Sequence, residues 1–222
     1  MHAGKPTLVI IGGTGALGSG LARRLAAAGY AIVIGSRTLD KAEAAARKLV
    51  APPGAPPPRG AANAEAAKAG DVVILTVPWA SHAQILETIK PHVTGKLVVD
   101  ATVPLVPPKV ARVQVPAETS AALAAQGRLG AAARVVAAFH NVAAHKLHSG
   151  APIECDVLIF GDDAKDREVV GALCAAAGLR GIHAGPLANA VAAEALTAVL
   201  IGINRTYKVD GAGLRITGIG ND

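Results

Sequence analysis

The sequence predicts an α/β fold in which helices cover both faces of a parallel sheet, a doubly wound arrangement. Short apolar runs typical of buried strands alternate with alanine-rich stretches typical of helices. The first apolar run, 7–11, is followed at once by a group of glycines and then by a helical pattern. At 222 residues the chain is long enough for one large domain or two small ones with a sizeable core.

The glycines after the first predicted strand have the spacing G-x-G-x-x-G, at Gly13, Gly15 and Gly18. In a dinucleotide site the first glycine allows a tight turn, the second lets the backbone approach a pyrophosphate, and the third lets the helix pack on the strand. The pyrophosphate then lies at the positive end of the helix dipole. The chain is therefore expected to begin with a Rossmann-type nucleotide-binding unit.

The second predicted strand, 31–35, is followed by Ser36 and Arg37, and Lys41 lies about one helical turn further on. Proteins selective for NAD place an acidic residue near this position to bind the ribose 2′-hydroxyl. A hydroxyl and two cations suit a 2′-phosphate instead, which predicts NADP(H) as the nucleotide. The alternative is that Arg37 and Lys41 are ordinary solvated charges at the start of a helix.

Two units of unequal size are expected. Residues 1–120 would form the NADP-binding Rossmann domain, and 121–222 a smaller α/β domain that closes a cleft against it. No true linker separates them, so the two should pack together. The expected helices are 40–50, 63–69, 81–90, 118–126, 164–177 and a long one ending at Tyr207; the expected later strands are 71–77, 96–100, 134–138, 155–160 and 179–184.

Two segments of this pattern are expected to be loops. The proline-rich stretch 51–58 cannot be helical and should be a surface connection. The segment 101–116 has no clear period and leaves the end of a central strand, where parallel sheets bind ligands.

Charge and cysteine content limit the kinds of partner. The formal net charge is +6 but there is no basic run, so a nucleic-acid surface is not expected, whereas anionic small molecules would be attracted. Cys155 and Cys174 lack C-x-x-C spacing and are expected to be buried thiols in a reducing compartment.

No targeting or membrane segment is expected. The first strand begins too early to leave room for a signal peptide, and the apolar stretch 187–203 is interrupted by Asn189 and Glu194 and is short for a membrane span. A soluble, cytoplasmic protein is predicted.

His140 is a candidate for contact with a ligand. With Asn141 it forms a polar pair between apolar residues, directly after the predicted strand 134–138, so it could contact a ligand or simply bond neighbouring backbone groups. His145 and His148 follow, but no supporting carboxylate or cysteine accompanies them, and no metal site is expected.

Other polar and aromatic residues at strand ends allow two interpretations each. Asp100 could contact a ligand or bind loop amides, and Trp79, after Pro78 on the strand facing the nicotinamide half, could line the redox pocket or pack in the interior. Asp162 and Asp163 are expected to cap a helix. No acid–base couple is evident, so no catalytic side chain is assigned, which suits hydride transfer between cofactors that carry the reactive atoms themselves.

Together these segments resemble the NADPH:coenzyme F420 oxidoreductase family over essentially the whole chain. The similarity rests on Asp71 and on the segments Gly12-Gly-Thr-Gly-Ala-Leu-Gly18, Gly35-Ser-Arg37, Thr76-Val-Pro-Trp79, Phe139-His-Asn-Val-Ala-Ala144, Gly161-Asp-Asp163 and Ala184-Gly-Pro-Leu187.

The resemblance implies a homodimer that transfers hydride directly between nicotinamide and the deazaflavin F420, with the two rings stacked. The C-terminal helix would be a plausible dimer surface. By position it implies that Thr14, Gly15, Ala16 and Leu17 hold the pyrophosphate, that Ser36, Arg37 and Lys41 hold the 2′-phosphate, that Val77, Pro78 and Ala144 contact NADP toward the nicotinamide, and that His140 and Val142 lie against the deazaflavin.

The chain departs from the family at a few positions. Ala16 stands where an asparagine is familiar, which should cost little because backbone groups bind the phosphates. Asn141 and Ala143 stand where some relatives differ, so the resemblance fixes NADP more firmly than F420. The alternatives are an NADPH-dependent reductase of a flavin, a pterin or a small imine or ketone, and a non-catalytic NADP(H) sensor.

Overall fold

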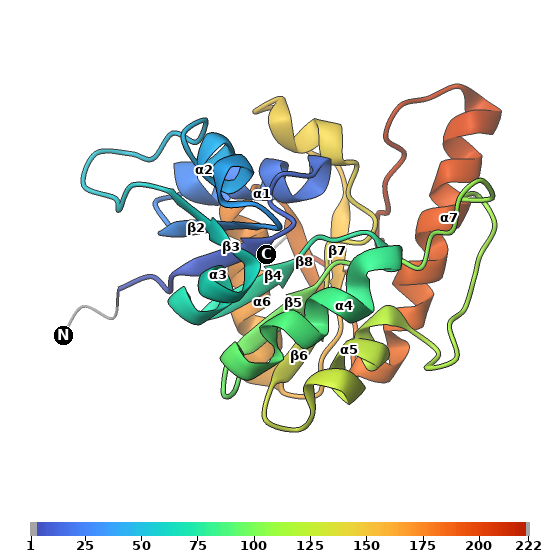
Figure 1. The fold of residues 1–222 in the computed structure, drawn as a ribbon. Coiled ribbons are helices and arrows are strands. Elements are labelled where there is room, and N and C mark those ends of the chain that lie inside the picture. Colours follow the sequence, from blue (N-terminus) through green and yellow to red (C-terminus); the bar gives the residue numbers. More distant parts are fainter. Residues whose placement is uncertain (1–3, 221–222) are drawn as a thin grey trace.

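The computed structural model describes residues 4–220 and contains a six-stranded, all-parallel sheet in the order β3-β2-β1-β4-β5-β6 (Figure 1). The doubly wound fold class is thereby confirmed. The strands are β1 (Leu8–Ile11), β2 (Ile32–Ser36), β3 (Arg59–Ala62), β4 (Val72–Leu75), β5 (Leu97–Asp100) and β6 (Arg134–Ala137).

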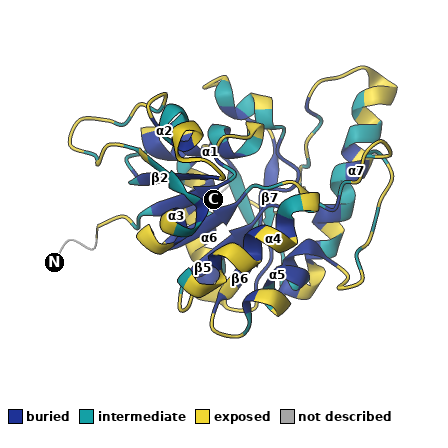
Figure 2. Cartoon of the chain, in the orientation of Figure 1, coloured by how far each residue is buried: buried dark blue, intermediate teal, exposed yellow. Residues whose placement is uncertain are grey.

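Successive side chains of the central strands enter two separate apolar layers. Leu8 and Ile10 of β1 belong to one buried cluster, whereas Val9 and Ile11 belong to the other. This alternation is the two-residue period of a strand, and it requires both faces of the sheet to be covered. Figure 2 accordingly shows the central strands as buried and the connecting loops as largely exposed.

Helices cover the two faces in separate groups. On the Leu8 side lie α1 (Ala16–Ala27), α2 (Leu39–Ala46) and α6 (Ala164–Ala176), and on the Val9 side lie α3 (Asn63–Ala69), α4 (Trp79–Ile89) and α5 (Ala121–Leu129). Short 3₁₀ turns follow α4 at η1 (Lys90–His92), follow β6 at η2 (Ala144–His148) and precede the last helix at η3 (Leu187–Asn189).

The smaller sheet holds two parallel strands, β7 (Asp156–Ile159) and β8 (Arg180–His183). It is joined to the large sheet by an antiparallel bridge in which the amides and carbonyls of Ala137 and Phe160 bond at 2.8 and 3.0 Å. Buried side chains of both sheets form one continuous apolar cluster, so the two parts are packed together as expected.

The strand expected at 134–138 in the smaller unit is instead β6, the edge strand of the large sheet. Its helix α5 also packs with the large sheet. The division of the chain at residue 120 stays a prediction, but these two elements belong with the sheet before it.

Strand β3 was not expected, because its sequence Arg-Gly-Ala-Ala contains no apolar run. It forms through packing: a Cβ atom on Gly60 would meet the backbone of α2 at Ala42 and Glu43, so glycine permits this close approach. Helix α2 ends at Ala46, earlier than the expected 50. The stretch 51–58 is irregular, as predicted.

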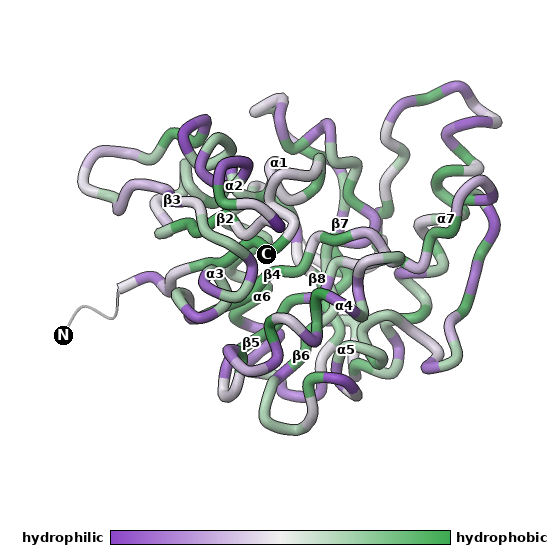
Figure 3. Tube along the Cα trace, in the orientation of Figure 1, coloured by the Kyte–Doolittle hydropathy of each residue, from purple (hydrophilic) through white to green (hydrophobic). Residues whose placement is uncertain are grey.

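The last helix, α7 (Ala190–Tyr207), stands at one edge of the molecule (Figure 1). Among residues 4–220, Leu187–Tyr207 is the one helical stretch that is long and apolar enough to cross a membrane, with mean hydropathy 1.6. The expectation that this stretch is too short to span a membrane is therefore wrong. Core helices of soluble proteins can have the same length and apolar composition. Figure 3 shows the helix as mixed in hydropathy, with hydrophilic residues near its outer end.

Candidate functional site

The nucleotide fingerprint lies where the strand order of the sheet reverses, between β1 and β4. Ligands of open parallel sheets bind at this switch point, outside the carboxyl ends of the strands. Gly12 makes the turn after β1, with φ of +79°, and a Cβ atom there would lie 2.7 Å from the Thr76 carbonyl oxygen. The tight turn therefore belongs to Gly12, and not to Gly13 as the spacing had suggested.

Helix α1 begins without a cap. Gly15 occupies the N-cap position with no side-chain hydrogen bond, and the first turn has no acidic residue. The first amides of a helix have no partner within it and carry the positive end of its dipole. This terminus therefore offers an anion several N–H donors, which suits a pyrophosphate.

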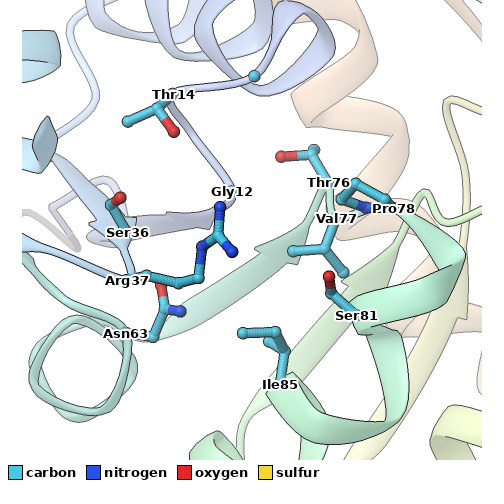
Figure 4. A pocket seen from close by; sticks show the side chains of 11 residues that line it. Gly12, Thr14, Ser36, Arg37, Asn63, Thr76, Val77, Pro78, Ser81 and Ile85 are labelled. Carbon is cyan, nitrogen blue, oxygen red and sulfur yellow. The ribbon is translucent and has the colours of Figure 1, made fainter.

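A cavity of about 240 Å³ opens in front of this terminus. Ser36 and Arg37 at the end of β2 form one wall, and Val77 and Pro78 after β4 form another (Figure 4). Arg37 is exposed and makes none of the ion pairs found in residues 4–220, so its guanidinium is available to a ligand. The cavity is lined by Gly12, Thr14, Gly15, Ser36, Arg37, Asn63, Thr76, Val77, Pro78, Ser81 and Ile85.

Asn63 lies beside Arg37, and sequence reasoning did not identify it (Figure 4). Its side chain is buried, and its Oδ1 atom has no hydrogen-bond partner within residues 4–220. An unpaired buried acceptor costs free energy, so a ligand donor at this point would stabilise the site. Asn63 also lines an adjoining cavity of about 290 Å³ that shares Ser36 and Arg37.

Lys41 faces a different space from Arg37. It lines a groove of about 520 Å³ between α1 and α2, together with Thr14, Arg23 and Lys48. Thr14 is common to this groove and the cavity at the fingerprint. The three predicted 2′-phosphate residues thus lie around the same end of β2 and α2, but Lys41 does not line the cavity that holds the other two.

His140 and Val142 line a separate cavity of about 140 Å³, between the turn after β6 and helix α7. His140 is 7% exposed, and neither ring nitrogen has a hydrogen-bond partner among the described residues. Burial lowers the pKa of His140 to about 4, against the opposing effect of the nearby Asp100 carboxylate. At neutral pH the imidazole is uncharged and can offer a ligand one donor and one acceptor.

Asp100 does not face either cavity. Its Oδ2 atom lies 2.7 Å from Nε2 of His82, and its Oδ1 accepts the Thr102 amide at 2.9 Å. Burial pushes the pKa of Asp100 up, but the charge and hydrogen bonds of His82 and the Thr102 bonds outweigh it and leave the pKa below its ordinary value. Asp100 therefore binds a loop amide, one of its two expected roles. Trp79 is half-buried and packs on His82, with ring centroids 5.3 Å apart, and it is not among the residues that line the two cavities.

Glu194 fixes helix α7 to the rest of the protein. Its carboxylate, which is 3% exposed, accepts the amides of Ala121 and Ala122 at the start of α5, at 2.7 and 3.1 Å. Burial raises the pKa of Glu194 to about 7, although these two hydrogen bonds act in the opposite direction.

The structure gathers some of the predicted site residues and separates others. Those at the switch-point cavity are Thr14, Gly15, Ser36, Arg37, Val77 and Pro78. Ala16 and Leu17 open helix α1 behind the turn, and Ala144 opens η2. Lys41 lies at the neighbouring groove, and His140 with Val142 at the cavity beside α7.

Several residues at or near these sites escaped sequence reasoning. Thr76 lies near the end of the predicted strand 71–77, and Ser81 and Ile85 lie in the helix predicted after it, so their position was a usable signal. Asn63 and His82 had no such signal, because one follows the unexpected strand β3 and the other pairs with a residue 18 positions away.

Other expectations concern capping, thiols and metals. Asp163 accepts the Lys165 amide at 2.7 Å and caps α6, and Asp162 accepts the Leu187 amide at 3.0 Å. Cys155 and Cys174 are buried free thiols. Within the described part of the chain, no group of three or more His, Cys, Asp or Glu side chains could hold a metal ion.

Comparison with known proteins agrees with this geometry. Residues 7–104 match the family described as "NADP oxidoreductase coenzyme F420-dependent". The F420-dependent NADP reductase of Methanothermobacter marburgensis is 37% identical over 96% of this chain and 98% of its own, and that of Methanocaldococcus jannaschii is 39% identical over the same shares.

Solved structures share the fold. A crystal structure titled as a putative F420-dependent NADP reductase from Arthrobacter sp. FB24 has a TM-score of 0.78 at 24% identity, covering 96% of this chain and 99% of that one. A reductive aminase from Aspergillus terreus in complex with NADPH has a TM-score of 0.65 at 22% identity, covering 92% and 63%. Relatedness of 37–39% over 96% of its length leads to one conclusion: the chain belongs to the F420-dependent NADP reductase family of oxidoreductases.

Proposed function

We propose that this protein transfers hydride between NADP(H) and the deazaflavin coenzyme F420. The observation that carries the proposal is the pairing of two receptive sites at the carboxyl edge of one sheet. One is the cavity at the uncapped start of α1, which Arg37 also lines, and the other is the cavity lined by His140. Relatives at 37–39% identity carry the name F420-dependent NADP reductase, which supports both partners.

The nucleotide would use the first site. The amides at the start of α1 fit a pyrophosphate, and Arg37 with Ser36 fits a 2′-phosphate, because guanidinium bonds phosphate with two parallel donors. Lys41 would add charge from the neighbouring groove. Val77 and Pro78 would then contact the nucleotide toward its nicotinamide end.

The acceptor would bind next to that end. Val77 follows β4 and His140 follows β6, two strands away in the sheet. Neighbouring strands are about 4.8 Å apart, so the two sites are separated by roughly 10 Å along the edge, enough for stacked rings between them. His140 and Val142 would contact the deazaflavin, and the uncharged imidazole would hydrogen-bond its polar edge.

The protein's part in the reaction is positioning. With both molecules bound, hydride leaves NADPH, NADP⁺ remains, and a solvent proton completes the reduced deazaflavin; the reverse reaction follows the same path. Apolar groups such as Val77 and Val142 would exclude water from the space between the nicotinamide and the deazaflavin. No side chain of the protein needs to exchange a proton, in agreement with the neutral state of His140.

The decisive experiment mixes the purified protein anaerobically with NADPH and oxidised F420 while the visible absorbance of the deazaflavin is followed. Rapid bleaching that needs NADPH and not NADH is the expected result. Parallel reactions with FMN, a pterin and a cyclic imine test the other reductase activities. NADPH binding with no hydride transfer to any acceptor would instead indicate a sensor and refute the proposal.

Replacing His140 by alanine should impair the acceptor side alone. We expect kcat/KM for F420 to fall about tenfold, the value of one lost hydrogen bond in a buried site, while the Kd for NADPH changes less than about twofold. Steady-state kinetics and fluorescence titration provide the two readouts. The control is His183→Ala, at an exposed histidine of β8. A fall in thermal stability without the selective kinetic effect would assign His140 to packing.

We further propose that the protein is a homodimer that acts in the cytoplasm. Helix α7 exposes Val199, Ile203 and Tyr207, by 46, 36 and 72%, and a second copy would cover these side chains. Two buried free thiols suit a reducing compartment. Sedimentation should give a dimer for the native chain and a monomer for a Val199→Glu/Ile203→Glu variant; a native monomer would contradict the assignment.

A further inference from the structure

We propose that Thr197 and Asn141 are positioning residues through which helix α7 holds the acceptor-binding turn in its active shape. The inference rests on the proposed function, because it takes His140 and Val142 as the residues that contact the acceptor. It adds two residues, and a helix, to which no role in the reaction has been assigned.

The turn 139–142 has a backbone shape that it does not favour by itself. Phe139 has φ of +69°, in the left-handed region that bulky side chains avoid. Such a conformation is strained and persists only where surrounding contacts enforce it. Phe139 itself is buried, at 1% exposed, and the next residue is His140.

Helix α7 supplies the enforcing contacts. The Thr197 hydroxyl donates to the His140 carbonyl oxygen at 2.9 Å. The Asn141 side-chain amide donates to the Ala193 carbonyl at 2.9 Å and to the Thr197 hydroxyl oxygen at 3.1 Å. Both hydrogens of the amide and the one hydrogen of the hydroxyl are thus used, and the orientation of Asn141 is fixed because only its nitrogen can face a carbonyl.

The helix that makes these contacts is itself anchored. Glu194 lies three residues before Thr197, on the same side of α7, and accepts the two amides of α5. The polar contacts therefore run from α5 through α7 to the turn. Leu200, one turn beyond Thr197, lines the cavity with His140, so the same helix forms both the support and a wall of this site.

Loss of the Thr197 hydroxyl should therefore displace His140 and Val142 and leave the nucleotide site unchanged. In Thr197→Val, which keeps the shape of the side chain, we expect the KM for F420 to rise about tenfold, with the KM and Kd for NADPH within about twofold of the native values. Thr197→Ser, which restores the hydroxyl, should return the KM for F420 to near the native value.

The control is Thr206→Val, at an exposed threonine near the end of the same helix. Asn141→Asp should act in the same direction as Thr197→Val, since it sets a carboxylate against the Ala193 carbonyl. An unchanged KM for F420 in Thr197→Val would overturn the proposal. So would an equal loss for both substrates that Thr197→Ser does not reverse, because that result describes a general packing role.

A second readout keeps this inference separate from the function itself. Amide hydrogen exchange of residues 139–143 should accelerate in Thr197→Val and not in Thr206→Val, whatever the acceptor. If the native protein fails to reduce F420, the proposed function falls, and the exchange result still decides whether the contact holds the turn. Unchanged exchange in Thr197→Val would overturn the positioning role.

Discussion

Replacing Arg37 by glutamate is expected to reduce kcat/KM for NADPH by at least about 100-fold while changing that for NADH less than about threefold. A hydrogen bond between charged groups contributes about 1.5–3 kcal/mol, and the new carboxylate would also repel the phosphate. Arg37 has no ion pair to lose within residues 4–220 and is exposed, so the substitution should leave the fold intact.

The measurement is steady-state kinetics with each nucleotide at saturating acceptor. Arg47→Glu makes the matched control, because Arg47 lies just beyond the end of α2, forms an exposed pair with Glu43 at 3.7 Å and is not among the residues that line the cavity. Equal losses of kcat/KM with NADPH and NADH would show that Arg37 does not bind the 2′-phosphate. A preference that stays at its native value would refute the assignment of NADP(H) to this end of β2.

Replacing Asp100 by alanine should produce the largest loss of stability, about 3–5 kcal/mol, because it leaves His82 buried without a partner. The two side chains are each about 1% exposed and lie 2.7 Å apart. The amide of Thr102 also loses its acceptor. Urea unfolding of the single variants Asp100→Ala and His82→Ala and of the double variant measures the coupling.

The pair should also make stability sensitive to acid. The pKa of Asp100 is below its ordinary value in the folded state, so its contribution is complete above the unfolded pKa of about 4 and is lost as pH falls toward the folded value. The native protein should therefore lose stability on acidification more steeply than Asp100→Ala. If the losses of unfolding free energy in the two single variants add up to that of the double variant, or if Asp100→Ala costs less than about 1 kcal/mol, the pair contributes little to stability.

Local patterns were sufficient to predict a large part of the fold. Buried parallel strands such as β1 and β4 are short apolar runs, and their alternation with helices indicates the doubly wound class. The fingerprint glycines were recognisable because close backbone packing admits few other residues there, although the positive φ belongs to Gly12. Arg37 could be identified because strand ends face ligands in this fold.

Local sequence patterns could not predict which strands pair with each other. β6 was expected in the smaller unit because a strand's sequence does not state which neighbour it joins, and parallel neighbours are distant in the chain. β3 was missed because its residues are held by packing on α2 at Gly60 and not by their own apolar character.

The sequence by itself determined the class of fold and the family, since each depends on short segments whose residue types are constrained by local geometry. Only the tertiary structure decided the pair of His82 with Asp100, the buried acceptor atom of Asn63, and the contact of Thr197 with the turn at His140. Thr197 and His140 are 57 positions apart. Hydrogen bonds across such separations depend on how whole elements pack, and no local pattern encodes them.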